Sequence, residues 1–294
     1  MDYLLRSMLF VPAYNEKFLD KAVHCDADAI IFDLEDAVPK VKRPEARKVL
    51  KKYLETGVFR GKQLFIRVNE LGTDDLPEDL KVITDDQITG VVVPKINNAG
   101  NIKAYEALLE VCEIREKLEK GSLKLLPLIE TAEAVLHVNK IAAASDRNIA
   151  LLFGGEDYLD SVSGKNDCPR RAFEMPRTMV ILAARTHGLL PIDTPYLDIK
   201  NEEGFMEEEH LALSMGFAGC LLVNPIQIPW CNQVFSPSEE EISKAEAMIA
   251  AVNKVHEEGG SIALLNGKMI GPPMLKRALK VLEVAEMIKK KEKL

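Results

Sequence analysis

Apolar and polar positions alternate along the chain in blocks, with short apolar runs separated by longer segments of helical spacing. The apolar runs are nearly continuous, which is typical of strands buried on both faces of a parallel sheet. Eight runs predict strands, at Met8–Val11, Ala29–Asp33, Leu64–Val68, Val91–Pro94, Leu125–Ile129, Ile149–Phe153, Leu190–Ile192 and Cys220–Val223. The segments between them predict helices at Pro44–Leu54, Asn101–Leu118, Ala132–Ala144, Met175–Thr186 and Glu207–Met215.

Eight β–α units in about 230 residues match the size of a (β/α)8 TIM barrel, an α/β fold. A doubly wound open sheet is the alternative, but the first run is not followed by the Gly-x-Gly-x-x-Gly of a dinucleotide-binding version. After residue 235, Ser238 with the acidic residues behind it predicts a helix start, Gly259-Gly260 its end, and Met274–Ile288 a last helix. We therefore expect a barrel catalytic domain at 1–235 and a C-terminal helical extension at 236–294.

The composition and charge exclude several classes of protein. With 47% hydrophobic and 29% charged residues in 294, the chain is an ordinary globular protein. Its net charge of −8 disfavours nucleic acid as a partner, and no apolar run is long enough to cross a membrane. The five scattered cysteines form no Cys-x-x-Cys pair, and no secretory signal opens the chain. We expect a cytoplasmic protein without a zinc site.

Polar side chains follow most of the predicted strands at their carboxyl ends. The segments are Asp33-Leu34-Glu35-Asp36, Arg67-Val68-Asn69, Pro94-Lys95, Glu130-Thr131, Gly154-Gly155-Glu156-Asp157 and Asn224-Pro225. In a barrel these ends meet at one mouth, where enzymes of this fold carry out their chemistry. We therefore expect four acidic groups, one arginine and one lysine to share a pocket.

Carboxylates crowded at one mouth repel one another unless they are protonated or bridged by a cation. Mg²⁺ prefers oxygen ligands and keeps several water molecules, so two carboxylates suffice to hold it. Glu130 and Asp157, from neighbouring strands, are the predicted ligands. Glu35 and Asp36 would then bind water around the ion.

Arg67 has a planar fork suited to a carboxylate or an enolate oxygen. The backbone N–H groups of Gly154 and Gly155 are expected to be accessible to a bound anion. The simpler alternatives are that each strand-end acid caps a helix or pairs with a neighbour, and that Arg67 forms a structural ion pair. The coincidence of all these groups at strand ends favours a functional site.

These segments resemble the citrate lyase β-subunit family, within the wider HpcH/HpaI aldolase/citrate lyase group. The resemblance extends almost from end to end. It is carried by Arg6–Pro12, Phe32–Val38, Arg67–Asn69, Pro94–Lys95, Ile129–Thr131, Gly155–Tyr158, Asn201–Phe205, Met215–Phe217, Asn224–Ile228 and Leu265–Met269.

The resemblance implies a homotrimer, Mg²⁺ on Glu130 and Asp157, and a keto acid on Arg67. It implies retro-Claisen cleavage of a 3-hydroxyacyl thioester (citryl, citramalyl or malyl) into oxaloacetate, pyruvate or glyoxylate and an acetyl thioester. The thiol would belong to coenzyme A (CoA) or an acyl carrier protein, and citrate lyase α and γ subunits would be potential partners. We assign catalysis to Arg67, Glu35 and Asp36, and substrate binding to Arg67 with Gly155, Glu156 and Asp157.

The chain departs from the family pattern at a position of chemical importance. Relatives carry an aspartate soon after the Gly-Lys-Met motif, on a C-terminal lid, where it serves as acid and base for the enolate. Here Gly271 stands where the aspartate is expected, and no acidic residue follows until Glu283. Two alternatives therefore stay open. One is a class II pyruvate aldolase acting on free 4-hydroxy-2-keto acids, and the other is a non-catalytic subunit that binds metal, keto acid or acyl-CoA.

Overall fold

The computed structural model describes residues 3–165, 169–257, 263–265 and 267–292, and the chain divides into two compact units. The larger unit is Leu5–Val234, and the smaller comprises Phe235–Leu294 with the first residues of the chain. A search of the described helices finds none with the length and apolar character needed to cross a membrane. The predicted break at Gly259-Gly260 and Cys168 lie outside the described residues.

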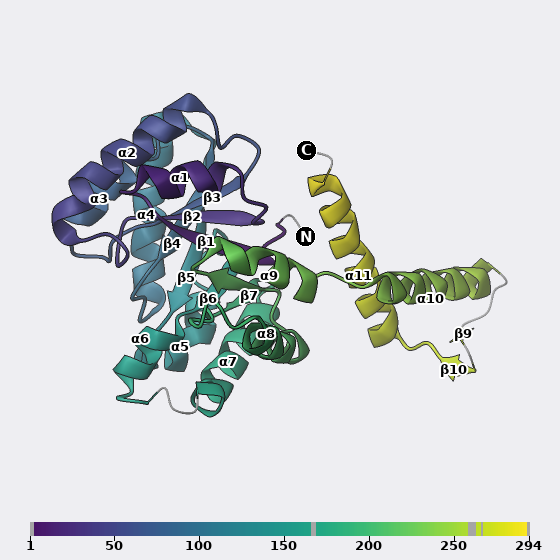
Figure 1. Cartoon of the computed structure of the whole chain (residues 1–294). Helices are drawn as coiled ribbons and strands as arrows, with labels where there is room; N and C mark the ends of the chain where they lie inside the picture. Colours follow the sequence, from purple (N-terminus) through teal and green to yellow (C-terminus); the bar gives the residue numbers. More distant parts are fainter. Residues whose placement is uncertain (1–2, 166–168, 258–262, 266, 293–294) are drawn as a thin grey trace. The chain divides into compact units, whose positions relative to one another are not determined.

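The larger unit is a closed barrel of parallel strands, which confirms the predicted fold (Figure 1). Over its described residues, eight strands pair in chain order, and β8 returns to pair with β1. The strands are β1 (Ser7–Pro12), β2 (Ala29–Asp33), β3 (Gln63–Arg67), β4 (Ile88–Val93), β5 (Lys124–Ile129), β6 (Ala150–Phe153), β7 (Leu190–Asp193) and β8 (Gly219–Leu222).

Burial on both faces explains the continuous apolar runs. All residues of β2, β6, β7 and β8 are buried, because side chains pointing inward fill the barrel and those pointing outward pack under the helices. The seam between β8 and β1 is tight at Gly219, where a β-carbon would clash with the carbonyl oxygen of Leu5. Arg6, just before β1, forms a buried ion pair with Asp28, just before β2, with Nε 2.8 Å from Oδ2.

Helices connect successive strands around the barrel (Figure 1). They are α1 (Glu16–Val23), α2 (Arg43–Thr56), α3 (Asp75–Leu80), α4 (Ala99–Glu116), α5 (Ala132–Ala142), α6 (Gly155–Ser161), α7 (Pro169–Thr186), α8 (Glu202–Met215) and α9 (Ile228–Val234), with short 3₁₀ turns at Lys40–Lys42 and Pro225–Gln227. The five predicted helices are present. Helix α8 begins earlier than predicted because the Asn201 side chain caps it, accepting a hydrogen bond from the Gly204 amide at 2.9 Å.

The smaller unit is built from two long helices and a short hairpin. Helix α10 (Glu239–Glu257) begins after Ser238, whose hydroxyl accepts a hydrogen bond from the Glu241 amide, as its sequence predicts. Strands β9 (Leu264–Leu265) and β10 (Lys268–Met269) pair and precede α11 (Pro272–Lys291). The unit has its own apolar core, formed by Val252, Ala263 and Ile270 with residues of both helices around them.

Candidate active site

The site starts from an ion pair between the last residues of two adjacent strands. Asp33 ends β2, Arg67 ends β3, and the two residues are paired in register. Arg67 Nε donates to Asp33 Oδ1 at 2.8 Å, and Nη2 donates to Oδ2 at 2.5 Å. The buried Asp33 also accepts hydrogen bonds from the amides of Glu35 and Ala37, each at 3.0 Å. Asp33 therefore fixes both the guanidinium and the turn that follows β2.

The Arg67 guanidinium is largely buried and faces two more carboxylates. Its Nη1 lies 3.2 Å from Glu35 Oε2 and 3.9 Å from Asp36 Oδ2. The Phe10 ring lies under it, 4.6 Å from the guanidinium carbon, in a cation–π contact. Burial lowers the pKa of Arg67, but the charges of Asp33, Glu35 and Asp36 outweigh it, so the pKa is raised above its ordinary value.

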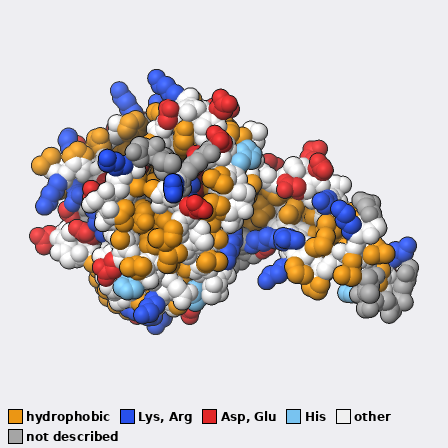
Figure 2. Space-filling view, turned by 90° about the horizontal axis from the view of Figure 1, so that it is seen from below, with side chains coloured by type: hydrophobic (Ala, Val, Ile, Leu, Met, Phe, Trp, Pro, Cys, Tyr) orange, Lys and Arg blue, Asp and Glu red, His pale blue; other side chains and the backbone are white. Residues whose placement is uncertain are grey.

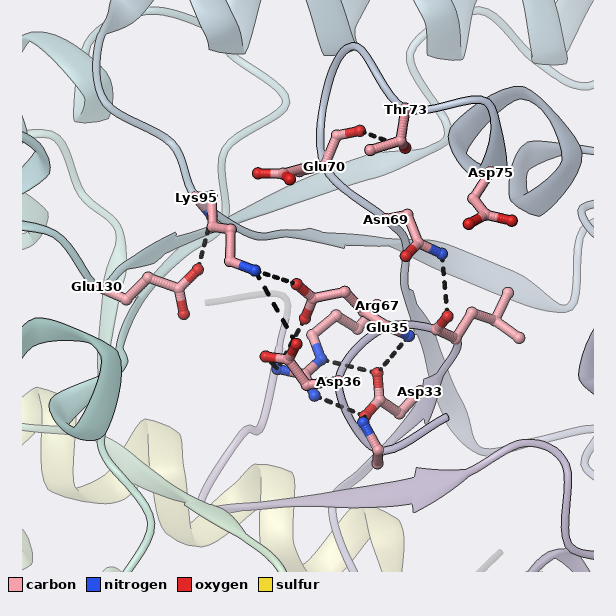
Figure 3. Close-up of polar contacts among 12 residues, drawn as sticks. Asp33, Glu35, Asp36, Arg67, Asn69, Glu70, Thr73, Asp75, Lys95 and Glu130 are labelled. Atoms are coloured by element: carbon pink, nitrogen blue, oxygen red, sulfur yellow. Dashed lines mark hydrogen bonds and ion pairs between the residues drawn. The ribbon is translucent and has the colours of Figure 1, made fainter. Parts of the chain in front are cut away.

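Lys95 connects this cluster with the next strand (Figure 3). Its Nζ lies 3.0 Å from Glu35 Oε1 and 3.9 Å from Asp36 Oδ1. Its backbone amide donates to Glu130 Oε1 at 2.6 Å. Lys95 has a left-handed backbone, with φ of 52°, which is uncommon for a residue other than glycine. Lys95, two residues after the end of β4, thus contacts Glu35 through its side chain and Glu130 through its backbone.

Burial perturbs the titration of Glu35. Its side chain is 3% exposed, and burial raises its pKa. Arg67 lowers the pKa, Asp36 raises it, and Lys95 lowers it, and the balance leaves it above its ordinary value. Neither Glu35 nor Asp36 caps α2, which begins only at Arg43, so the helix-cap alternative is wrong for both.

Glu130 and Asp157 are the two acids predicted to hold the cation. Glu130, just after β5, is 2% exposed, and burial raises its pKa to about 8. The Lys95 amide opposes that shift, whereas the charges of Asp157 and Glu35 add to it. Asp157 lies in the first turn of α6, and its pKa is also raised, by burial first and then by the charge of Asp36. Both carboxyl groups are therefore harder to ionise than an isolated acid, and a bound cation would favour their charged forms.

The turn after β6 differs in part from its predicted role. The amide of Gly154 donates to the Ile129 carbonyl at 3.0 Å, and that of Gly155 donates to Thr194 Oγ1 at 2.9 Å. The prediction that these two amides are accessible to an anion is therefore wrong, because both already have partners within the fold. Gly154 instead lets the backbone pass close to Glu130, since a β-carbon there would lie 2.6 Å from Glu130 Cβ.

Glu156 lies in the first turn of α6. It is exposed and lines a separate cavity of about 190 Å³, together with Arg177, Thr194 and Glu208. The cluster drawn in Figure 3 contains Glu35, Asp36, Arg67, Lys95 and Glu130. Asp157 is linked to it through its electrostatic interaction with Glu130.

The acids present suit a hard cation that is only partly coordinated by protein. Among the described residues, no group of three or more His, Cys, Asp or Glu side chains is arranged to hold a metal alone. Two carboxylates that repel each other, one of them nearly buried, still match Mg²⁺, which takes one or two carboxylates and leaves its other positions to water and substrate. The residues fit such an ion.

Three residues of the site had no predicted role. Asp33 and Lys95 stand in the strand-end segments, and Phe10 lies within the first predicted strand. Their position at carboxyl ends was a usable signal for Asp33 and Lys95. For Phe10 there was none, because an apolar residue inside a strand is normally part of the core.

A barrel with ionisable side chains from several strands at its carboxyl mouth has the arrangement of a barrel enzyme. The chain belongs to the HpcH/HpaI aldolase/citrate lyase family, which matches residues 6–225. It is 32% identical to the citrate lyase subunit beta of Leuconostoc mesenteroides subsp. cremoris over 282 residues, covering 96% of this chain and 93% of that protein. It is 34% identical to the (3S)-malyl-CoA thioesterase of Cereibacter sphaeroides over 283 residues, covering 96% and 95%.

Solved structures agree with the sequence comparisons. The chain is similar to CitE from Mycobacterium tuberculosis in complex with magnesium, acetoacetate and coenzyme A, with a TM-score of 0.73, 28% identity and coverage of 95% and 97%. It is also similar to the citrate lyase beta subunit from M. tuberculosis complexed with oxaloacetate and magnesium, with a TM-score of 0.66, 28% identity and coverage of 79% and 99%. The resemblance predicted from the sequence motifs is therefore confirmed.

Proposed function

We propose that the protein is a Mg²⁺-dependent carbon–carbon lyase that cleaves a citryl-, citramalyl- or malyl-type thioester into a 2-keto acid and an acetyl thioester. The proposal rests on the positions of Glu130 just after β5 and Asp157 just after β6, and on the electrostatic interaction of Glu130 with both Asp157 and Arg67. Family membership and relatives that bind magnesium with small oxo acids support it.

Glu130 and Asp157 would hold the ion, which supplies positive charge to the substrate's hydroxyl and carboxylate oxygens. Arg67 would bind the keto-acid carboxylate. Its bonds to Asp33 use two of the five N–H donors of a guanidinium, so donors remain for substrate. Glu35 and Asp36 flank Arg67 and are assigned to catalysis, where they would also order water beside the ligands.

Gly155 and Glu156 were assigned to substrate binding from the sequence. In the proposal Gly155 supports the site by close packing, because a β-carbon there would lie 2.8 Å from the Phe173 ring and 2.9 Å from Thr194 Oγ1. Glu156 would contact only the part of the substrate furthest from Arg67, since it lines a different cavity. Asp157 remains the main contribution of this turn.

A large cavity next to the site supports a CoA-sized thioester. It measures about 790 Å³ and lies along α1 and α9, lined by Phe10, Phe18, Lys21, His24 and Asn224 among others. Phe10 lines this cavity and also contacts the Arg67 guanidinium, so we propose that the cavity and the site adjoin. Its wall is largely apolar with a lysine, which suits an acyl-pantetheine chain with a phosphate.

Carbon–carbon cleavage removes the hydroxyl proton of the substrate and adds a proton to the acetyl carbon, so the site needs a group for each transfer. Gly271 supplies neither, which favours a second candidate function, that of a non-catalytic subunit binding metal with keto acid or acyl-CoA. The Gly271→Asp variant separates the two. A large gain in lyase rate would support natural loss of catalysis, and an unchanged, already fast rate would support transfer by another group.

We also propose a homotrimer. Hydrophobic side chains gather on one face of the larger unit (Figure 2), and α5, α7 and α8 carry exposed ones, including Leu136 at 74% and Leu182 at 63%. Exposed apolar patches on globular proteins commonly mark interfaces between subunits. Light scattering after size exclusion would give three times the chain mass of 32.7 kDa, and a monomer mass would contradict the proposal.

The lyase assignment is tested by offering citryl-, citramalyl- and malyl-CoA with Mg²⁺ and measuring the keto acid released. We expect turnover of at least one thioester, abolished by EDTA and by Glu130→Gln. The lyase assignment would be rejected if turnover were unaffected by EDTA and by Glu130→Gln, or if no thioester were turned over. Cleavage of a free 4-hydroxy-2-keto acid without response to acyl-CoA would favour a pyruvate aldolase instead.

A further inference from the structure

We propose that Lys95 is a positioning residue of this site, holding Glu130 by its backbone amide and Glu35 by its ammonium while its own backbone stays left-handed. The inference rests on the proposed function, because it concerns the residue proposed to bind the cation. In this role the backbone amide of Lys95 orients Glu130, and its side-chain ammonium holds Glu35.

The two contacts lie on opposite sides of the residue. The amide reaches Glu130 Oε1 at 2.6 Å, and Nζ reaches Glu35 Oε1 at 3.0 Å. Figure 3 shows Lys95 lying between the two acids, with its side chain directed at Glu35 and its backbone at Glu130. Val93 and Pro94 before Lys95 and Ile96 after it are all buried, so the main chain is anchored on both sides of the residue.

The left-handed backbone connects the two contacts. With φ at 52°, the conformation is disfavoured for most residues with a β-carbon, asparagine being among the exceptions, and for lysine it persists only when surrounding interactions hold it. The ammonium bond to Glu35 is such an interaction, since a charged hydrogen bond to a buried carboxylate is among the stronger ones, and the Glu35 side chain is 3% exposed against 37% for Lys95. We infer that this bond keeps the amide aimed at Glu130, and hence keeps the Glu130 carboxylate oriented for the cation.

This coupling predicts an unusual ranking of substitutions. Every replacement of Lys95 by an uncharged residue removes the same ammonium and the same repulsion toward a cation. Glycine and asparagine tolerate the left-handed region, whereas alanine and methionine do not. Without the bond to Glu35, Lys95→Ala and Lys95→Met relax and release Glu130, whereas Lys95→Gly and Lys95→Asn keep the amide in place.

The experiment measures the dissociation constant of Mn²⁺, by electron paramagnetic resonance of the free ion, for the full chain and the four variants. We expect Lys95→Ala and Lys95→Met to bind Mn²⁺ about fivefold or more weakly than Lys95→Gly and Lys95→Asn, although all four lack the charge. Circular dichroism identifies which variants are folded. If one variant of a pair (Ala and Met, or Gly and Asn) does not fold, the other variant of that pair is used for the comparison.

Equal Mn²⁺ affinity across the two classes would overturn the role of Lys95, because a purely electrostatic or packing role does not distinguish glycine from alanine in this order. The proposed function fails in a different way. In that case the unsubstituted chain shows no Mn²⁺ binding that Glu130→Gln weakens, whatever the variants of Lys95 do.

Discussion

A single added methyl group at Gly154 should disrupt the candidate site. Gly154 follows β6, where its backbone passes directly beside the Glu130 side chain. A β-carbon at this position would lie 2.6 Å from Glu130 Cβ, 2.9 Å from Glu130 Oε2 and 3.5 Å from Leu128 Cγ. Gly154→Ala therefore acts on the acid proposed to bind the cation without removing any polar group.

The size of the effect follows from these distances. Two carbon atoms in favourable contact lie about 3.5–4.0 Å apart, so Glu130 must move by about 1 Å to admit the methyl group. A misplacement of that size typically costs about 10²-fold in rate. Overpacking of a buried region also destabilises by about 1–3 kcal/mol, which lowers the melting temperature by several degrees.

The assay is kcat/KM for thioester cleavage, with Mn²⁺ affinity and melting temperature measured on the same preparations. The matched control is Gly271→Ala, because a β-carbon there has Pro273 Cδ as its nearest neighbour at 3.7 Å, an ordinary contact, and its φ is −86°. We expect a loss of about 10²-fold in Gly154→Ala and no comparable loss in the control. Activity within about twofold of the unsubstituted protein would refute the idea that this backbone sets the position of Glu130.

Three further predictions follow from other contacts. Arg67→Lys loses the planar fork that pairs with Asp33, so kcat/KM should fall by about 10²-fold, and a fall of less than threefold would argue against a carboxylate-binding role. Burial raises the pKa of Glu209 well above its ordinary value, so the folded state keeps a proton that the unfolded chain releases, and stability falls as pH rises above about 4.5. Glu209→Gln removes that loss, so its advantage in urea denaturation should grow from pH 5 to pH 8, and a constant difference would contradict this account. Arg147→Met leaves Glu113 buried without its ion pair and should destabilise by about 3–5 kcal/mol, whereas a near-neutral effect would indicate that Glu113 becomes protonated at little cost.

Much of the barrel could be predicted from sequence because the physical signal was local. Continuous apolar runs identified every strand of the described barrel, and β2 was predicted with its observed bounds. The predicted bounds were less exact where apolar and other residues are mixed. Strand β4 begins at Ile88 and not at Val91, because Thr89 and Gly90 interrupt the apolar run although they belong to the strand. Short helices such as α3 and α6 were missed, since two turns give too few residues for a helical period to stand out.

The site was predictable only in part, because it combines local position with distant contacts. Strand ends placed Glu35, Arg67 and Glu130 at one mouth, and the structure brings them together with Lys95. The hydrogen bond of the Gly155 amide could not be predicted, since its partner Thr194 lies 39 positions away, just after the end of another strand. The left-handed backbone of Lys95 was also hidden, because nothing in a Pro-Lys dipeptide indicates a positive φ.

A crystal structure of the protein grown with Mg²⁺ and oxaloacetate tests the central claim most directly. We predict one magnesium ion with a carboxylate oxygen of Glu130 and one of Asp157 each at about 2.0–2.1 Å, and the oxaloacetate carboxylate on Arg67. An ion bound elsewhere, or an ion coordinated by neither acid, would contradict the account.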